Sequence, residues 1–273
     1  MASLTLMTLP IGNYADITQR ALAALKDGEY FLAEDTRVFK DVLRFYKISF
    51  KEKIIESFHD QSDDHKFIKI FHWLEQGKEV FLVSDAGSPL ISDPAYPLIR
   101  KILEQGHSLR GLPGVNSVTS ALELSGLPPH PHTFHGFLPR EEEKKKLLLQ
   151  GLSKGTHLFF ESPQRVEKSL WQMSEWTPLY EISVCRELTK TYESVYRFKA
   201  SEFLSIKEQM VFKGEFVIVV YCPLQNNLKY TQLEKLTRDY MAKSTPKKLA
   251  KIFSEILGTP SKEIYNLLGA GRK

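Results

Sequence analysis

The 273-residue sequence predicts an α/β protein with two α/β domains, a cleft between them and a small helical appendage at the C-terminus. Three observations indicate this fold class. Short runs of β-branched and aromatic residues alternate with amphipathic stretches, as in sheets covered by helices. A segment rich in Pro and Gly, 113–133, interrupts the alternation near the middle of the chain. A Lys-rich stretch with two Thr-Pro pairs follows the last predicted strand.

The first half of the chain alternates strands and helices. We expect strands at 3–9, 29–34, 53–58, 79–84 and 108–113, and helices at 16–26, 37–46 and 64–76. In the first helix, Leu22 and Leu25 stand at helical spacing. Because strands separated by helices pair in parallel, this half predicts a largely parallel sheet.

The second half has a different order of elements. A helix should follow the Pro-Gly at 113–114. We then expect strands at 133–137, 157–162, 181–187, 191–198 and 215–222, and helices at 141–153, 164–176 and 201–209. Two of these strands adjoin without a helix between them, which favours a mixed sheet. The predicted domains are therefore 1–115, 116–225 and a tail, 226–273, with a linker at 226–230.

The tail differs from the rest of the chain in charge. Residues 226–273 contain ten Lys or Arg and four Asp or Glu, whereas the whole chain carries only +4. Thr-Pro pairs at 245–246 and 259–260, with Gly258 between them, give the spacing of a helix–turn–helix. A basic tail of this kind suits a polyanionic partner such as nucleic acid. A solvated helical appendage is the alternative.

Composition excludes several classes of protein. Apolar residues make up 42% and charged residues 26% of the chain, as in a globular protein. The longest apolar run, 216–222, is far shorter than the ~20 residues of a membrane helix, as are shorter runs such as 80–83. The N-terminus lacks the basic start of a secretory signal, and two cysteines cannot form a disulfide framework. We therefore expect a cytoplasmic protein without membrane contact.

Common catalytic motifs are absent. The sequence has no Walker A pattern, no G-x-G-x-x-G, no H-E-x-x-H and no paired C-x-x-C. His130, His132 and His135 cluster in PPHPHTFHG, but no nearby Cys or second cluster completes a set of four ligands. We therefore expect a connecting loop here and no bound metal.

Polar loops follow three strands of the first half. SDAGSPLISDP (84–94), PIGN (10–13) and PGVNS (113–117) each come after a strand, and open α/β sheets bind ligands at that edge. Gly87 lets a ligand approach the backbone, and Asp85 and Asp93 can accept hydrogen bonds. ESPQR (161–165) and CRELTK (185–190) are equivalent loops in the second half. Two sheets that present such loops to each other would form the cleft.

These segments carry a family resemblance. The segments, in unbroken order, are LPIGNYADITQRAL (9–22), AEDTR (33–37), SDAGSPLISDP, LPGVNS (112–117), ALELSGLP (121–128), GFLPR (136–140), FESPQR (160–165), CRELTKTYE (185–193) and KGEFVIV (213–219). The chain resembles the tetrapyrrole methylase superfamily of S-adenosylmethionine-dependent methyltransferases. It is most similar to the branch that methylates a cytidine 2′-hydroxyl in 16S ribosomal RNA (rRNA).

The resemblance implies a homodimer that binds S-adenosylmethionine in the cleft and acts on 16S rRNA of the small ribosomal subunit. With the loops above, it gives these cofactor contacts: Pro10, Gly12, Asn13, Asp85, Gly87, Ser88, Ile91, Ser117, Val118, Phe160, Glu187, Glu215 and Phe216. Adenine needs apolar walls such as Ile91 and Phe160, and the methionine end needs hydrogen-bonding groups.

Transfer to a ribose hydroxyl benefits from a base or from a cation beside the developing oxyanion. The first candidate is Lys190, as the cation, and further catalytic candidates are Glu161, Asp93 and Arg186. Asp35 and Glu187 are alternative bases. A structural ion-pair cluster of Arg186, Glu187 and Lys190 is the competing interpretation. For RNA phosphates the candidates are Arg37, Lys40, Arg165, Lys247, Lys248 and Lys251.

Two other functions compete with rRNA methylation. A tetrapyrrole or other small-molecule methylase on the same fold would not need the basic tail. A non-catalytic RNA-binding protein would use the tail alone and would bind no cofactor. The intact loops 84–94 and 113–117 argue against this second alternative.

Overall fold

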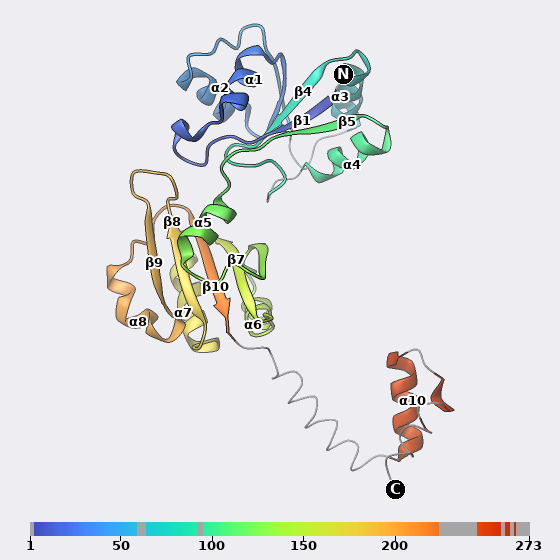
Figure 1. Cartoon of the computed structure of the whole chain (residues 1–273), viewed down its shortest axis with the longest axis vertical. Coiled ribbons are helices and arrows are strands. Elements are labelled where there is room, and N and C mark those ends of the chain that lie inside the picture. The colour runs from blue at the N-terminus through green and yellow to red at the C-terminus, as the bar shows by residue number, and fades with distance from the viewer. Residues whose placement is uncertain are drawn as a thin grey trace. The chain divides into compact units, whose positions relative to one another are not determined.

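The computed structural model describes residues 3–58, 64–91, 95–223, 245–257, 260–262 and 265. The chain divides into two compact units, Met1–Pro223 and Leu224–Lys273. The first unit contains two sheets, each with its own helices (Figure 1). The first sheet ends before residue 113 and the second begins after residue 131. The boundary predicted between residues 115 and 116 falls in the connection and stays a prediction.

The first sheet is entirely parallel, with strand order β3-β2-β4-β1-β5. Its strands are β1 (Ser3–Met7), β2 (Tyr30–Ala33), β3 (Ile54–Ser57), β4 (Glu79–Val83) and β5 (Ser108–Leu112). Around it lie η1 (Tyr14–Asp16), α1 (Gln19–Asp27), α2 (Thr36–Phe45), α3 (Asp64–Glu75) and α4 (Tyr96–Glu104). The five predicted strands and the parallel pairing are confirmed.

Both faces of this sheet are buried. Phe31 and Phe81 pack on the side of α1 and α2, while their neighbours Leu32 and Leu82 pack in a separate core. A parallel sheet needs such double cover, because its crossover helices lie on both faces. Helix α4 was not among the predicted elements, because it begins beside Pro97, a residue that can equally signal a loop. Its Leu98 and Ile102 are fully buried.

The second sheet is mixed, as predicted, with strand order β6-β7-β10-β8-β9. Only β6 and β7 pair in parallel, and the other three pairs are antiparallel. The elements are α5 (Ser117–Ser125), β6 (His132–Phe137), α6 (Glu142–Gln150), β7 (Gly155–Glu161), α7 (Val166–Trp176), β8 (Glu181–Arg186), β9 (Ser194–Lys199), η2 (Ala200–Glu202), α8 (Phe203–Ile206), η3 (Lys207–Gln209) and β10 (Phe216–Cys222). The continuous helix expected at 201–209 is instead three short pieces.

The two faces of the second sheet are covered unequally. The core on one face combines Phe159, Val184 and Ile218 with residues of α6, α7 and α8. On the other face, Ala121 of α5 packs with Leu158, Cys185 and Val219 in a smaller core. Helix α5 lies on this face (Figure 1), and Phe160, Cys185 and Val217 of the same sheet line a pocket.

The second unit contains α10 (Pro246–Leu257), which begins at the predicted Thr-Pro pair. Leu249 and Ala250 are buried, while Lys247, Lys248 and Lys251 are exposed. The helix therefore has a basic outer face. The linker at 226–230 lies outside the described residues, as does most of the second tail helix. Across the described part of the chain, no helix is long and apolar enough to span a membrane.

Candidate functional site

Three loops of the first sheet meet at its carboxyl edge, as predicted. Leu9 and Gly87 exchange two backbone hydrogen bonds of 3.0 Å. Thr8 donates its backbone N–H to the carbonyl of Leu112, and its hydroxyl lies 2.9 Å from that of Ser88. Gly87 has a φ of +75°, and a Cβ there would lie 3.2 Å from the side chain of Ile11. The loops after β1, β4 and β5 are therefore tied together by bonds that need a glycine at this point.

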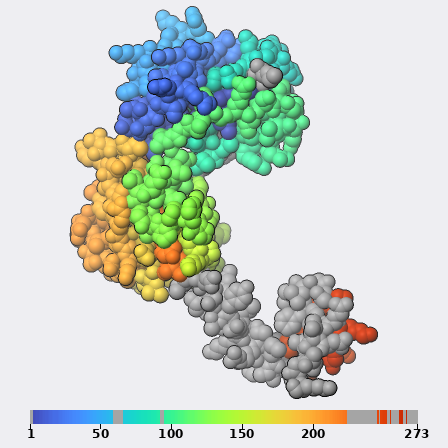
Figure 2. Space-filling model, viewed as in Figure 1, coloured from blue at the N-terminus to red at the C-terminus, as the bar shows by residue number. Residues whose placement is uncertain are grey.

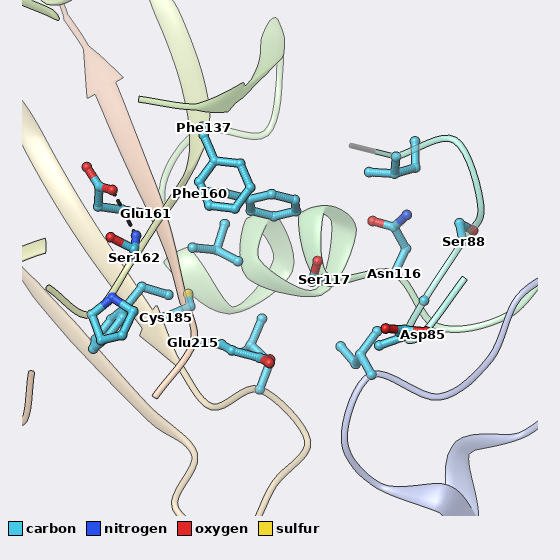
Figure 3. Close-up of a pocket in the computed structure, with 18 of the residues that line it drawn as sticks. Asp85, Ser88, Asn116, Ser117, Phe137, Phe160, Glu161, Ser162, Cys185 and Glu215 are labelled. Carbon is cyan, nitrogen blue, oxygen red and sulfur yellow. Dashed lines mark hydrogen bonds between the residues drawn. The ribbon is translucent and has the colours of Figure 1, made fainter. Parts of the chain in front are cut away.

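A pocket of about 520 Å³ opens beside these loops. Both sheets contribute to its lining, as Figure 3 shows. The lining residues are Ile11, Glu34, Asp85, Ala86, Gly87, Ser88, Ile91, Asn116, Ser117, Phe137, Phe160, Glu161, Ser162, Pro163, Cys185, Leu188, Glu215, Phe216 and Val217. This volume lies in the range of about 300–1,000 Å³ typical of small-molecule sites.

The first domain supplies carboxylates to the pocket. Asp85 Oδ1 accepts a hydrogen bond of 3.0 Å from the backbone N–H of Asp35. The backbone N of Asp85 donates to Glu34 Oε2 at 3.4 Å. Burial raises the pKa of Asp85. Hydrogen bonds from Arg37 lower the pKa of the neighbouring Asp35 to about 2. Asp35 is thus a firmly ionised helix cap beside the pocket, which disfavours it as a base.

The N-terminus of α5 also faces the pocket (Figure 3). Asn116 caps this helix, because its Oδ1 accepts a hydrogen bond of 2.8 Å from the backbone of Val118. Ser117 follows as the first helical residue and lines the pocket. The partial positive charge of a helix N-terminus favours an anionic group such as a carboxylate.

The second domain supplies an apolar wall. Phe160 packs against Phe134 with ring centroids 4.8 Å apart, and against Phe137 at 5.5 Å. Leu188 and Val217 continue the same wall. Burial raises the pKa of the Cys185 thiol to about 11, so that it stays neutral and acts as an apolar group.

The turn after β8 joins the two domains. Asn13 donates its backbone N–H to the hydroxyl of Thr189 at 3.0 Å, and a Cβ at Gly12 would overlap the side chain of Lys190. Figure 2 shows the blue and orange surfaces meeting in this region. Glu187 and Thr189 have φ values of +52° and +67°, a conformation that non-glycine residues rarely adopt. Such strain is typical of functional sites.

Lys190 is held by two carboxylates in this turn. Its Nζ donates to Glu187 Oε1 at 3.0 Å and to Glu215 Oε2 at 2.9 Å. Partial burial alone would lower the pKa of Lys190, but the two hydrogen bonds outweigh it and raise the pKa. Glu215 lines the pocket and Lys190 does not. Lys190 therefore reaches the pocket through Glu215 rather than as a separate cation.

Arg186, another catalytic candidate, is turned to the backbone. Its guanidinium donates to the carbonyl of Lys213 at 2.5 Å and to that of Tyr192 at 2.8 Å. The residue is only 9% exposed and does not line the pocket. These contacts favour the structural interpretation for Arg186, because the guanidinium closes the loop that precedes β10.

Glu161 lies at the edge of the pocket with its carboxylate fully engaged. It accepts hydrogen bonds from Ser162 N at 2.8 Å and Ser169 Oγ at 2.7 Å, and Arg165 Nη2 lies at 2.5 Å. Figure 3 shows the carboxylate directed away from the centre of the pocket. These contacts therefore disfavour Glu161 as a base. Its carboxylate instead holds the side chain of Arg165 against the protein. Asp93 lies outside the described residues.

Eight of the expected cofactor contacts line the pocket: Asp85, Gly87, Ser88, Ile91, Ser117, Phe160, Glu215 and Phe216. The other five do not line it: Pro10, Gly12, Asn13, Val118 and Glu187. Several lining residues were not anticipated: Ile11, Glu34, Ala86, Asn116, Phe137, Ser162, Pro163, Cys185, Leu188 and Val217. Most of these stand next to an expected contact, or two residues from it along a strand.

Two predicted RNA contacts lie on α2. The side chain of Arg37 is 88% exposed and is paired with Asp35. Lys40 Nζ lies 6.0 Å from the ring centroid of Phe50. Neither residue lines the pocket. Among the side chains that the structure describes, no group of three or more His, Cys, Asp or Glu is placed to hold a metal ion.

Comparisons with known proteins identify similar chains. The family model described as Tetrapyrrole (Corrin/Porphyrin) Methylases matches residues 3–204. A Bacillus subtilis protein named ribosomal RNA small subunit methyltransferase I is 36% identical over 278 residues, covering 97% of this chain and 94% of that protein. A Thermotoga maritima protein of the same name is 37% identical over 222 residues, covering 81% of this chain and 98% of its own length.

Solved structures show the same fold. Uroporphyrin-III-C-methyltransferase from Thermus thermophilus has a TM-score of 0.55 at 15% identity, covering 81% of this chain and 94% of that one. The cobalt precorrin-4 methyltransferase has a TM-score of 0.56 at 18% identity, covering 80% and 94%. At such low identity these likenesses establish the fold and leave the substrate open.

Proposed function

The chain belongs to the tetrapyrrole (corrin/porphyrin) methylase family, and from its similarity to relatives named ribosomal RNA small subunit methyltransferase I we propose that it methylates the 2′-hydroxyl of a cytidine in 16S rRNA. It is an S-adenosylmethionine-dependent rRNA methyltransferase. The observation that carries this conclusion is the 36% identity over 97% of the chain to a relative of that name. The choice of cytidine and of the ribose hydroxyl is the finer part of the proposal.

The pocket suits S-adenosylmethionine in shape and chemistry. Asp85 and Glu34 offer acceptors for the amine or for ribose hydroxyls, and the N-terminus of α5 suits the carboxylate. Ile91 and Phe160 offer apolar surface for adenine. Gly87 lines the pocket without a side chain of its own. The residues present therefore offer groups suited to the amine, the carboxylate and the adenine of the cofactor.

When bound, the cofactor supplies an electrophilic methyl group. The protein contributes by positioning the hydroxyl in line with that methyl, which can supply up to ~7–11 kcal/mol of the barrier. We assign proton removal from the hydroxyl to Glu215, which lines the pocket and is 77% exposed in its side chain. Its ion pair with Lys190 engages Oε2, whereas both carboxylate oxygens of Asp35 and of Glu161 are engaged. Lys190 orients Glu215 and is a positioning residue, which differs from the direct role that the sequence indicated.

RNA contacts extend the proposal beyond the pocket. The exposed side chains of Arg37 and of Lys247, Lys248 and Lys251 support a role for them in binding phosphates without taking part in the chemistry. Lys40 remains a candidate on the same helix as Arg37. Arg165 is the weakest candidate, because Glu161 already pairs with it. The homodimer and the cytoplasmic location remain proposals that follow from the family.

The experiment measures transfer of labelled methyl from S-adenosylmethionine. Assembled small subunits, naked 16S rRNA and a porphyrinoid are offered in parallel, and the labelled product is digested to nucleosides. We expect the label in 2′-O-methylcytidine. Label only in the porphyrinoid would move the chain to the small-molecule branch. No label, together with no cofactor binding in calorimetry, would support the non-catalytic RNA-binding alternative.

A further inference from the structure

Phe137 is an aromatic residue that lines the pocket and yet remains largely open. It is 56% exposed, against 38% for Ile91, another large apolar residue of the lining. Its ring is inclined by 67° to that of Phe160, so the two rings meet edge-on and do not stack. A face of the Phe137 ring is therefore free to receive a planar group.

A β-bulge directs this ring to the pocket. Phe134 pairs with Leu158 and Phe137 with Phe160, so three steps along β6 match two steps along β7. The extra residue is accommodated at Gly136, whose φ of +71° allows the turn of the backbone. Without the bulge, strand alternation would place Phe137 on the opposite face from Phe134. Bulges beside binding sites commonly redirect a side chain in this way.

The backbone next to Phe137 is fixed. Leu138 donates its N–H to the carbonyl of Phe160 at 3.1 Å, and its carbonyl accepts a hydrogen bond of 3.2 Å from Arg165 Nη1. These hydrogen bonds fix the backbone that carries the ring, so little conformational entropy is lost when the ring binds a ligand. The charge of Arg165 is already paired with Glu161, whereas Arg140, three residues after Phe137, is exposed and has no ion pair among the described residues.

We propose that Phe137 is the surface on which the target nucleobase of the RNA stacks while its ribose enters the pocket. An open aromatic ring near an exposed cationic side chain such as Arg140 is an arrangement that binds an unstacked base and its phosphate. The adenine of the cofactor is the competing planar group, but Phe160 is the more enclosed ring and better suits a cofactor held along its length. This inference rests on the proposed function.

The test compares three substitutions at one position: Phe137→Ala, Phe137→Leu and Phe137→Tyr. Alanine removes the ring, leucine keeps apolar bulk without a ring, and tyrosine keeps the stacking surface. Leu147→Ala is the matched control, because Leu147 is 72% exposed on α6 and does not line the pocket. For each variant we would measure kcat and KM with small subunits and with naked 16S rRNA, the Kd for S-adenosylmethionine, and thermal unfolding.

Base stacking on an aromatic residue predicts a loss of about 5- to 150-fold in kcat/KM for Phe137→Ala. The loss should come mainly from KM for the RNA and should recur in Phe137→Leu. Phe137→Tyr and Leu147→Ala should match the wild-type protein. The Kd for S-adenosylmethionine and the unfolding temperature should stay unchanged in all four variants.

Three results would overturn the inference while leaving the proposed function intact. These are an unchanged kcat/KM in Phe137→Ala, full activity in Phe137→Leu, or a weaker cofactor Kd that accounts for the whole loss. The last result would assign Phe137 to adenine. A wild-type protein that binds S-adenosylmethionine but labels no RNA would contradict the proposed function, and the inference with it.

Discussion

The two domains contribute different kinds of surface to one pocket. The first sheet is covered by helices on both faces, so it offers only the loops at its carboxyl edge, with Asp85 and Asn116 among them. The second sheet leaves part of one face free of α5, and that face presents Phe160 and Val217. An edge of loops is polar because its backbone and caps need partners, and a sheet face is apolar because its strands are buried. The first domain thus contributes loop and helix-cap groups such as Asp85 and Asn116, and the second contributes the aromatic surface of Phe137 and Phe160. We call these the polar half and the apolar half, although Ile91 belongs to the first and Glu215 to the second.

The largest effect should come from the junction between the halves, at Glu215 and Lys190. Because Lys190 acts through Glu215, Glu215→Gln and Lys190→Met should each lower kcat by about 10²-fold. The double variant should be no slower than the worse single variant, as expected for residues that act as a unit. Steady-state kinetics with small subunits measures this. Lys207→Met, which removes an ion-paired lysine of the same domain, is the control. Full turnover in Lys190→Met would exclude Lys190 from the mechanism.

A change in the polar half should act on cofactor binding. Loss of a hydrogen bond to a charged group costs about 1.5–3 kcal/mol, so Asp85→Asn should weaken S-adenosylmethionine binding by about 10- to 150-fold in calorimetry. Asp41→Asn changes an exposed carboxylate on α2 and should have no such effect. Equal affinities of Asp85→Asn and the wild-type protein would remove Asp85 from the binding site.

The pH dependence sharpens the same prediction. Because burial raises the pKa of Asp85, its carboxylate is lost on acidification at a higher pH than that of an ordinary Asp. In the wild-type protein, cofactor affinity should therefore fall as the pH is lowered through this raised pKa. In Asp85→Asn, the affinity should depend less on pH. The effect on the free energy of unfolding has the opposite sign. A raised carboxyl pKa stabilises the fold below the unfolded pKa, and this stabilisation is lost as the pH rises through the folded value. At pH 7 Asp85→Asn should thus unfold no earlier than the wild-type protein.

A change in the apolar half should be milder. Phe160→Leu keeps apolar bulk but removes the aromatic ring that we place against the adenine. A contact between two aromatic rings is worth about 0.5–1.5 kcal/mol, so the Kd for S-adenosylmethionine should rise by about 2- to 10-fold. Phe45→Leu, at an aromatic residue 58% exposed on α2, is the matched control. A larger loss than in Asp85→Asn would reverse the assignment of the two halves.

The smallest effect on the pocket should come from the tail. Replacing Lys247, Lys248 and Lys251 together by Gln should leave cofactor binding unchanged and weaken rRNA binding. For each lysine that pairs with a phosphate, its removal should reduce the slope of log K against log salt by about 0.7–0.9. Filter binding at several salt concentrations measures this slope. An unchanged slope would assign rRNA affinity to the first unit, whose length is close to that of the Thermotoga maritima match.

The polar half could be predicted better than the apolar half. Asp85, Gly87 and Ser88 follow a strand in sequence, and the position of such a loop in a parallel sheet is fixed by topology. Phe137 was not predicted to line the pocket. The bulge at Gly136 interrupts the alternation of side chains along the strand, and the face of a sheet is assigned to each residue from that alternation. Helix α4 was not predicted because Pro97 begins a helix as readily as it marks a loop.

The catalytic candidates show a different limit. The sequence identifies Arg186 and Lys190 as charged residues in suitable loops, but each has a partner far along the chain. The carbonyl of Lys213 engages Arg186, and Glu215 engages Lys190. Whether a charge is free or paired depends on such long-range contacts, which a single sequence does not display. Glu215 was expected only as a cofactor contact for the same reason, since Lys190 lies 25 residues away.

A crystal structure of the full chain with S-adenosylhomocysteine would test the division of the pocket most directly. We predict the ligand in the pocket with its amino-acid end against Asp85 and the N-terminus of α5, and its adenine against Phe160 and Val217. The ring of Phe137 should remain uncovered by the adenine. A ligand that contacts residues of one domain only, or that binds with its two ends reversed, would contradict the account.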